Sequence, residues 1–398
     1  MVLNGLLDHN NPNVKIEALK TIAAKQDELD GELDRAILNK IGLIRGIQPT
    51  LRLEALNAVQ NPGKYQELVY ELSEGNPYVF PIKYDVLKKI ITDEDVLNLI
   101  KKDVETESRL EKFFAFQELA SWWGNLPDST KNDHLQQVKG LIKDQIKTAD
   151  RSTVFVMGSL LSDTLLITEQ EYPLFEELLS RFKLPEDIEV YQALTSVLKE
   201  RFEEEASSLI DSLASQNNAA LNQSLRSQGW EIPESEAPKT EFRAPDWKRL
   251  TWLGAYRILV VETNKGDFKI QMDVLNAPAT ISGIQQLVKE KKYQWVPFHR
   301  VVPNFVIQGG DIETQNGFGG PDYVVPTEGS ATHYKRGKVG IASAGTDTEG
   351  SQFFVMNQWQ SHLNGRYTII GEVIEGMEVV DRIVQGDVIR KMYWQSTW

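Results

Sequence analysis

Glycine is distributed very unevenly along this chain, and the distribution limits the folds open to its two halves. Of the 27 glycines in 398 residues, 10 lie in residues 1–230 and 17 in the remaining 168. Glycine destabilises helix interiors but suits the tight turns that join strands. We therefore expect helices before residue 230 and a turn-rich β structure after it.

The charge balance changes at the same place. Residues 1–246 contain 27 Lys and Arg against 42 Asp and Glu, a balance of −15, whereas residues 247–398 contain 16 against 15, a balance of +1. Pro233, Pro238 and Pro245 lie between the two regimes in a polar, acidic stretch that disfavours a helix. We predict a helical domain over residues 1–226, a proline-containing linker over 227–250 and a second domain over 251–398.

Three nine-residue segments of the first half share one pattern of apolar, basic and acidic positions. They are Val14–Ile22, Leu51–Val59 and Ile82–Ile90, at offsets of 37 and 31 residues. Such a period is typical of helix pairs that bury their apolar faces against their neighbours. The segments resemble HEAT repeats, and the resemblance extends over roughly residues 1–226. The uneven offsets keep an irregular helical bundle open as the alternative.

The helical half also carries two acidic clusters, at residues 93–95 and 203–205. The plainer interpretation is solvated helix surface or helix caps, and the second is an acidic surface that binds a protein partner. The sequence does not decide between them.

Residues 251–398 alternate short strand-like runs with glycine-rich turns. Residues 255–263 and 268–274 are rich in β-branched residues and are separated by Asn264–Asp267, which predicts a hairpin. One apolar stripe at helical spacing runs from Ile281 to Val288 and predicts a helix packed on a sheet. We therefore expect a multi-domain chain, with an all-α repeat array followed by a mainly antiparallel, closed or nearly closed β-barrel.

Composition excludes several kinds of chemistry. Cysteine is absent, which removes disulfides, thiol nucleophiles and zinc fingers, and no two of the five histidines stand at i, i+4 as a helical metal pair requires. The net charge of −14 argues against nucleic-acid binding. We expect no metal, no nucleic-acid partner and no membrane span.

Localisation is open at this stage. No targeting segment is visible, so the cytoplasm is the default expectation. The repeat pattern begins abruptly near Asn11, which suggests that the chain starts inside a longer protein. In that case a targeting segment could lie upstream, and the cell envelope or periplasm is possible.

Three ordered stretches of the second half identify a family. They are FHRVVPNFVIQGGD (298–311), GKVGIASAGTDTEGSQFF (337–354) and HLNGRYTIIGEVIEGMEVVDRI (362–383), accompanied by the loop Asn316–Gly320. Together they resemble the cyclophilin family of peptidyl-prolyl cis-trans isomerases over about 145 residues. The resemblance implies a cyclophilin-type barrel and a cofactor-free isomerase (rotamase) that acts on proline-containing polypeptide clients in protein folding. The helical repeats would then serve as a protein-interaction module.

The reaction itself explains which groups are needed. Rotation about an Xaa-Pro bond breaks amide resonance, with a barrier of about 18–20 kcal/mol, but cleaves no bond. The catalyst requires an apolar slot for the proline ring and a donor near the prolyl nitrogen, and a guanidinium has the fixed geometry and permanent charge for that task. The competing interpretation is a scaffold or chaperone whose barrel binds proline-containing segments with little turnover.

The resemblance assigns roles to individual residues. Arg300 and Gln308 match the catalytic arginine and the glutamine that holds both the arginine and the substrate backbone. Residues that match the substrate-binding positions of the proline pocket and the adjoining groove are Phe305, Val306, Gly317, Ala342, Ser343, Ala344, Gln352, Phe354, His362, Leu363 and Tyr367.

Four of these positions depart from common family residues. Val306 stands where methionine is frequent, Ser343 where asparagine is, His362 where tryptophan or phenylalanine is, and Tyr367 where histidine is. His362 removes a large apolar wall beside the pocket. We therefore predict retained isomerase activity with weak binding of cyclosporin-type ligands.

Overall fold

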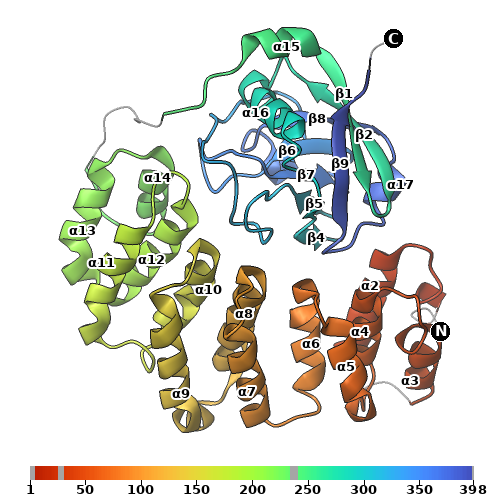
Figure 1. Cartoon of the computed structure of the whole chain (residues 1–398). Coiled ribbons are helices and arrows are strands. Elements are labelled where there is room, and N and C mark those ends of the chain that lie inside the picture. Colours follow the sequence, from red (N-terminus) through yellow and green to blue (C-terminus); the bar gives the residue numbers. More distant parts are fainter. Residues whose placement is uncertain (1–4, 26–30, 234–240, 397–398) are drawn as a thin grey trace. The chain divides into compact units, whose positions relative to one another are not determined.

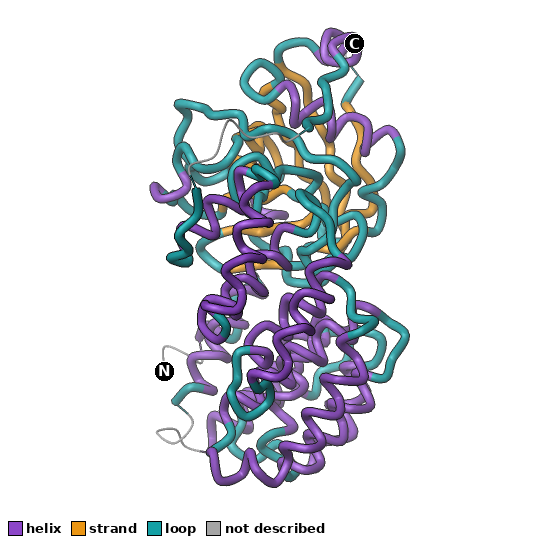
Figure 2. The backbone as a smooth tube through the Cα atoms, turned by 90° about the vertical axis from the view of Figure 1, so that its left-hand side faces the viewer, coloured by secondary structure: helices purple, strands orange, loops and turns teal. Residues whose placement is uncertain are grey.

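The computed structural model describes residues 5–25, 31–233 and 241–396. Their contacts form two compact units, one of Met1–Leu119 with Asp381–Gly386 and one of Ala120–Val380 with Asp387–Trp398. Within these ranges, all of the strands lie in the C-terminal half of the sequence, whereas helices account for most of the residues up to 227 (Figures 1 and 2). The predicted change from helical to β structure is confirmed.

The three repeated sequence segments each form a helix of the first unit. α2 (Pro12–Ala23), α4 (Pro49–Ala58) and α6 (Phe80–Leu87) pack in consecutive order, α2 on α4 and α4 on α6. Asn11 caps α2 by accepting a hydrogen bond from the amide of Asn13, and proline occupies the first turn. The other helices here are α3 (Gly31–Ile37), α5 (Gln66–Ser73) and α7 (Asp93–Val104), while α8 (Arg109–Asn125) contributes residues to both units.

A segment from the far end of the sequence completes the core of this unit. The side-chain amide of Asn13 donates to the carbonyls of Asp381 and Ile383, both at 2.9 Å. Val384 joins the buried cluster that includes Leu19 and other side chains of α2, α4 and α6. The helices of the first unit therefore pack against Asp381–Gly386 as well as against one another.

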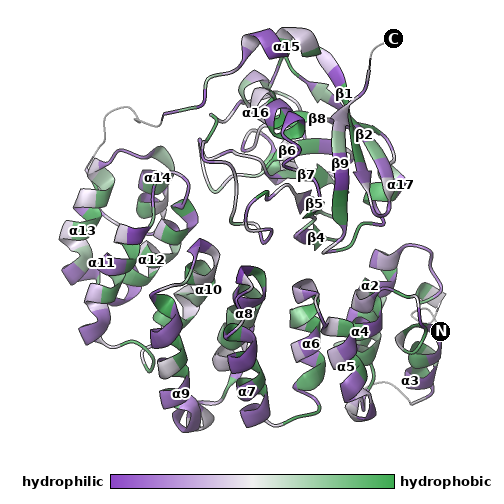
Figure 3. Cartoon of the chain, in the orientation of Figure 1, coloured by the Kyte–Doolittle hydropathy of each residue, from purple (hydrophilic) through white to green (hydrophobic). Residues whose placement is uncertain are grey.

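The second unit contains the remaining helices. Each carries both hydrophilic and hydrophobic residues (Figure 3), with most of the apolar ones buried; Trp247, Trp252 and Phe155 are exposed. Both acidic clusters lie in the first turn of a helix, where carboxylates stabilise the helix end. The helices of this unit are α9 (Asp128–Ile146), α10 (Arg151–Leu161), α11 (Tyr172–Arg181), α12 (Ile188–Arg201), α13 (Glu203–Ser215), α14 (Ala219–Ser227), α15 (Trp247–Leu253), α16 (Pro278–Lys289) and α17 (Met377–Val380).

α15 begins inside the segment predicted as a linker. The Asp246 side chain accepts a hydrogen bond from the amide of Arg249 and so caps this helix, a signal that the prolines of the segment obscured. Residues 234–240 of the predicted linker, which include Pro238, lie outside the described residues.

A curled, nine-stranded antiparallel sheet dominates the C-terminal half. The predicted hairpin is present: β1 and β2 pair along their whole length, with Tyr256 opposite Asp273 at one end and Thr263 opposite Gly266 at the other. The predicted helix is α16. Strand order is β3-β9-β1-β2-β8-β6-β7-β5-β4. The strands are β1 (Tyr256–Thr263), β2 (Gly266–Asp273), β3 (Val296–Pro297), β4 (Arg300–Val302), β5 (Val306–Gly309), β6 (Lys338–Ile341), β7 (Phe353–Met356), β8 (Ile369–Glu375) and β9 (Val388–Trp394).

This arrangement confirms the predicted mainly antiparallel fold and refines one detail of it. Within the described residues, the end strands β3 and β4 do not pair, so the sheet curls into an incomplete barrel. Among the same residues, no helix is long and apolar enough to cross a membrane.

Candidate active site

Four adjacent strands place the main candidate residues in one cross-strand row. Arg300 on β4 is opposite Gln308 on β5, Gln308 is opposite Phe354 on β7, and Phe354 is opposite Gly340 on β6. Directly opposed residues of antiparallel strands project on the same face of the sheet. Sheet register therefore brings an exposed arginine, an amide and an aromatic ring to one face.

An apolar cluster lies on this part of the sheet. Its buried members include Val306, Phe354 and Leu363, and Phe305, Ala342 and Tyr367 pack against it while remaining partly exposed. The ring of Tyr367 meets that of Phe354 edge-on at 5.8 Å between centroids, and the imidazole of His362 lies 6.0 Å from the ring of Phe305. The residues predicted for the proline pocket are therefore neighbours in space.

Arg300 borders this cluster. Its guanidinium carbon lies 5.6 Å from the centroid of the Phe305 ring, close enough for a cation–π contact. Phe305 lies in the turn that follows β4. Its amide donates to the carbonyl of Val302, and its carbonyl accepts a hydrogen bond from the amide of Asn357. The tight turn between β4 and β5 thus places the aromatic ring beside the cation.

A chain of amide groups leads from the row to a neighbouring loop. The Gln308 side-chain nitrogen donates to Gln352 Oε1 at 3.1 Å. Gln352 Nε2 in turn donates to the carbonyls of Gly317 and Gly319 at 2.8 and 2.9 Å. The two glutamines therefore have defined orientations that are tied to the loop at residues 311–319.

Asp311 organises that loop. Its buried carboxylate accepts hydrogen bonds from the amides of Thr314, Gly317 and Gly319 at 2.8–3.1 Å, among others. Burial opposes ionisation of Asp311, but hydrogen bonds from the Thr314 hydroxyl and from the amides of Gly317 and Glu313 outweigh it and leave its pKa below the usual value. Gly317 has φ +101, a conformation that favours glycine, and a Cβ there would approach the His299 ring.

The predicted groove residues Ala342, Ser343 and Ala344 follow directly after β6. The amide of Ala342 donates to the carbonyl of Gln352, and the amide of Ala344 donates to Thr348 Oγ1, both at 2.9 Å. This short segment and Gln352 line one cavity together with Gln308 and Gly317. The predicted site residues thus fall into two neighbouring groups, the apolar cluster and this groove.

Two nearby groups play other roles. His299 is buried, and burial lowers its pKa to about 4, so the ring is neutral near pH 7. The hydroxyl of Ser351 is buried and donates to the Gly310 carbonyl at 2.7 Å. Among the described residues, no group of three or more His, Cys, Asp or Glu is arranged to hold a metal ion.

Sequence reasoning missed three residues that shape the apolar cluster. Tyr334 stacks on Phe354 at 5.5 Å between centroids, and its hydroxyl donates to the Thr368 carbonyl at 3.2 Å. Gly340 leaves the space that both rings occupy, because a Cβ there would lie 2.3 Å from the Tyr334 hydroxyl and 2.5 Å from Phe354 Cζ. Met356 belongs to the same buried cluster. The glycine within a strand was the available signal for such a close approach.

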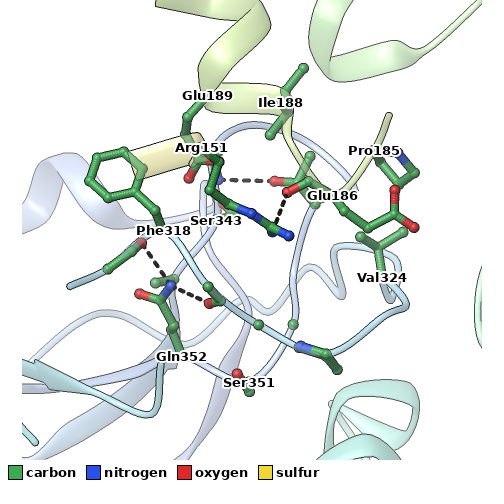
Figure 4. A pocket seen from close by; sticks show the side chains of 18 of the residues that line it. Arg151, Pro185, Glu186, Ile188, Glu189, Phe318, Val324, Ser343, Ser351 and Gln352 are labelled. Atoms are coloured by element: carbon green, nitrogen blue, oxygen red, sulfur yellow. Dashed lines mark hydrogen bonds between the residues drawn. The ribbon is translucent and has the colours of Figure 1, made fainter. Parts of the chain in front are cut away.

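The groove also has a wall that the motifs did not indicate. The cavity against Gln308, Gly317 and residues 342–344 is also lined by residues of α10, of the segment that leads into α12 and of the first turn of α12 (Figure 4). These residues are Arg151, Pro185, Glu186, Ile188 and Glu189. They lie more than a hundred positions earlier in the sequence, so no local pattern could have pointed to them.

Comparisons with known proteins agree with this geometry. Residues 258–395 match the profile described as "Cyclophilin type peptidyl-prolyl cis-trans isomerase/CLD". The chain is 38% identical over 136 residues to peptidyl-prolyl cis-trans isomerase B of Bacillus subtilis (strain 168), covering 34% of this chain and 93% of that protein. It is 34% identical over 172 residues to a peptidyl-prolyl cis-trans isomerase of Helicobacter pylori (strain 26695), covering 42% of this chain and 95% of that protein.

A solved cyclophilin-type isomerase from Cryptosporidium parvum aligns with a TM-score of 0.34 and 27% identity, covering 36% of this chain and 99% of that one. The sequence relatives and the site together define a prolyl isomerase domain in the C-terminal half. The chain belongs to the cyclophilin-type peptidyl-prolyl cis-trans isomerase family. The predicted family and the isomerase class are thereby confirmed.

Proposed function

We propose that this protein accelerates rotation about Xaa-Pro bonds in polypeptide clients, with Arg300 and Gln308 as its catalytic residues. The observation that supports this best is the cross-strand row, in which register alone aligns Arg300, Gln308 and Phe354 beside one apolar cluster. The row combines a permanent cation with a pocket for a hydrophobic ring, the two features that proline isomerisation requires.

The proposed mechanism is electrostatic. In the planar ground states the prolyl nitrogen shares its lone pair with the carbonyl, and in the twisted transition state the nitrogen becomes pyramidal and can accept a hydrogen bond. Arg300 would donate a hydrogen bond to the prolyl nitrogen in the twisted transition state but not in the planar ground states. The hydrogen bond therefore lowers the barrier to rotation. A rate increase of five decades corresponds to roughly 7 kcal/mol of such differential stabilisation.

Apolar side chains would hold the proline ring during rotation. Phe305, Val306, Phe354 and Leu363 provide the pocket surface, with His362 and Tyr367 at its edge. Excluding water strengthens the hydrogen bond from the guanidinium, because the local dielectric constant falls. Ring burial thus serves both binding and catalysis.

Residues before the proline would lie along the adjoining groove. Backbone groups of Ala342, Ser343 and Ala344 border it, together with Gln352 and Gly317. Gln308 would hold the substrate backbone and keep Arg300 in place. This division predicts that proline-ring contacts and upstream contacts can be altered separately.

The helical half is proposed as a module that holds protein clients. The proposed boundaries are residues 1–226 for the repeats, 227–250 for the linker and 251–398 for the isomerase domain, with α15 (Trp247–Leu253) crossing the last of these limits. The charge of −15 over residues 1–246 favours basic partners for this surface.

A protease-coupled assay on a short Xaa-Pro peptide tests the proposed function. The full chain should accelerate cis-to-trans conversion in proportion to enzyme concentration. If it instead binds the peptide, as measured by calorimetry, and leaves the rate unchanged, the barrel is a binding module and the catalytic proposal is wrong.

A further inference from the structure

A second cavity of the isomerase domain lies apart from the proposed substrate site. It has a volume of about 840 Å³ and is lined by residues of α15, α16 and β9 and of the loop that follows α16 (Figure 1). None of the described residues that line it belongs to the proposed proline pocket or to the adjoining groove. Ligand-binding pockets typically measure about 300–1,000 Å³, so this cavity is large enough for several side chains of a partner.

The charged residues in this lining are mostly basic. Five of them are lysine or arginine, and one is acidic, Asp246, whose Oδ2 lies 3.0 Å from the Nε of Arg249. Lys248, Lys289 and Lys291 are exposed, and within the described residues none of the three forms an ion pair. The lining therefore carries a net positive charge.

Aromatic rings lie among these cations. Trp252 on α15 is 57% exposed, and the guanidinium carbon of Arg257 lies 4.8 Å from its ring centroid. On β9, the ammonium of Lys391 lies 4.6 Å from the ring centroid of Tyr393, and the neighbouring Trp394 is partly exposed. Tryptophan and tyrosine are enriched at protein interfaces, where their rings become buried. The lining thus offers apolar faces and positive charge together.

Two polar groups of the lining lack a hydrogen-bond partner within the described residues. They are the Oε1 of Gln285, a residue that is 8% exposed, and the Nε1 of Trp394. Buried polar groups are nearly always paired, so two unpaired ones in one lining point to a ligand that supplies their partners. The amide oxygen requires a donor, and the indole nitrogen requires an acceptor. A polypeptide backbone offers both kinds of group, whereas a simple anion offers acceptors only.

We propose that this cavity docks an acidic segment of a protein partner. Aspartate or glutamate side chains of the segment would lie beside Lys248, Lys289 and Lys291, and a large apolar side chain would pack on Trp252. The backbone of the segment would pair with the two unpaired polar groups. The inference goes beyond the proposed function, because docking at this cavity uses no residue of the proline pocket. A docked partner would raise the local concentration of its own prolines at the active site.

Single-stranded nucleic acid is the competing occupant, because it also binds to combinations of cations and aromatic rings. The charges around the cavity disfavour it. Glu262 is opposite Lys391 in the pairing of β1 with β9, Glu290 follows Lys289 at the end of α16, and residues 247–398 have a balance of only +1. A phosphate backbone requires an extended basic surface, whereas a short acidic segment requires only a local one.

Binding of a designed peptide to the full chain tests the proposal. The probe is a fluorescently labelled, proline-free peptide that is rich in Asp and Glu and has a central Trp, and fluorescence anisotropy measures its binding. One reference peptide carries Asn and Gln in place of the acidic residues, and the other carries Ser in place of the Trp. We expect the probe to bind about tenfold or more tightly than either reference, as charge-assisted and aromatic contacts produce. Its affinity should fall as salt is raised, because charges contribute to it.

Three variants and a control locate the effect. Lys248→Gln, Lys289→Gln and Trp252→Ala should each weaken binding of the probe several-fold. Lys335→Gln makes the same charge change at an exposed residue outside the cavity and should leave binding unaltered. Thermal unfolding shows whether each variant is folded, and the isomerase activity of each on a short Xaa-Pro peptide should equal that of the unmodified chain.

Several results would overturn the proposal. Equal affinity for the acidic and the neutral peptide would do so, as would unaltered binding of the probe by the two lysine variants. Tighter binding of a single-stranded oligothymidylate than of the probe would assign the cavity to nucleic acid. Self-association of the full chain that Trp252→Ala abolishes would assign it to a second copy. Each of these results would leave the isomerase function intact, because activity is measured separately.

Discussion

At the scale of single residues, the site depends on small groups that create space for large ones. Gly340 illustrates this because Tyr334 and Phe354 occupy the volume that any side chain at that position would need. Because Gly340 has no side chain, the rings of Tyr334 and Phe354 can take the positions that form the proposed proline pocket. The same reasoning explains why a glycine lies in the middle of β6, where it would otherwise weaken the strand.

Gly340→Ala should displace the Phe354 ring and lower kcat/KM about tenfold or more, since overpacking a well-packed position shifts side chains at a cost of typically 1–3 kcal/mol. The change is measured as isomerase activity together with thermal unfolding. Gly329→Ala is the matched control, because a Cβ there meets nothing within 4 Å. Full activity in Gly340→Ala would show that the ring position does not matter.

A second residue-scale effect concerns stability as a function of pH. Burial raises the pKa of Glu349 from 4.5 to about 7, although the carboxyl accepts hydrogen bonds from Thr368. The folded state therefore holds a proton between pH 4.5 and 7 that the unfolded state releases. The protonated Glu349 carboxyl therefore contributes fully to the free energy of unfolding below about pH 4.5. As pH rises through 7 the carboxyl ionises and this contribution is lost, which lowers the free energy of unfolding by up to about 3 kcal/mol.

Glu349→Gln should accordingly flatten the fall in unfolding free energy between pH 5 and pH 8, measured by denaturant titration. A slope remains because the pKa values of Glu54, Glu118 and Glu189 are also raised to about 7. Glu378→Gln, an exposed substitution on α17, should reproduce the unmodified curve. If the pH dependence of Glu349→Gln coincides with that of the unmodified chain, the raised pKa of Glu349 in the folded state is contradicted.

At the scale of elements, the 311–319 loop is held by one carboxylate. Asp311→Asn should loosen this loop, because a neutral amide is a weaker acceptor for the converging amides of Thr314, Gly317 and Gly319. We expect faster hydrogen exchange at these amides and a several-fold lower kcat/KM. The exposed Asp322→Asn is the control, and unchanged exchange at Gly317 would remove Asp311 from this role.

Sequence patterns predicted several of the individual elements. The repeated pattern over Val14–Ile22 predicted a helix at α2, and the turn at Asn264–Asp267 predicted the β1–β2 hairpin. α15 was not expected, since its cap at Asp246 lies in a proline-rich stretch. The motifs named Arg300 and the residues around it, but not the reason for their alignment, which is the register of four strands.

At the scale of the whole molecule, long-range packing was beyond sequence reasoning. Asp381–Gly386 packs in the unit formed by the first helices, and Glu186 and Glu189 line a cavity with residues 342–344. Both cases join segments separated by more than 150 positions. Composition indicated two unlike halves of the sequence. No local pattern indicated that Asp381–Gly386 would belong to the unit of the first helices, or that the later helices would belong to the same unit as the sheet.

The central claim is that one guanidinium provides the catalysis, and replacing it is the most direct test. We expect Arg300→Ala to lower kcat/KM on an Xaa-Pro peptide by orders of magnitude while thermal unfolding stays close to that of the unmodified chain, because this side chain is exposed. Arg390→Ala, an exposed substitution on β9, should retain full activity. Equal activity in Arg300→Ala and Arg390→Ala would contradict the account.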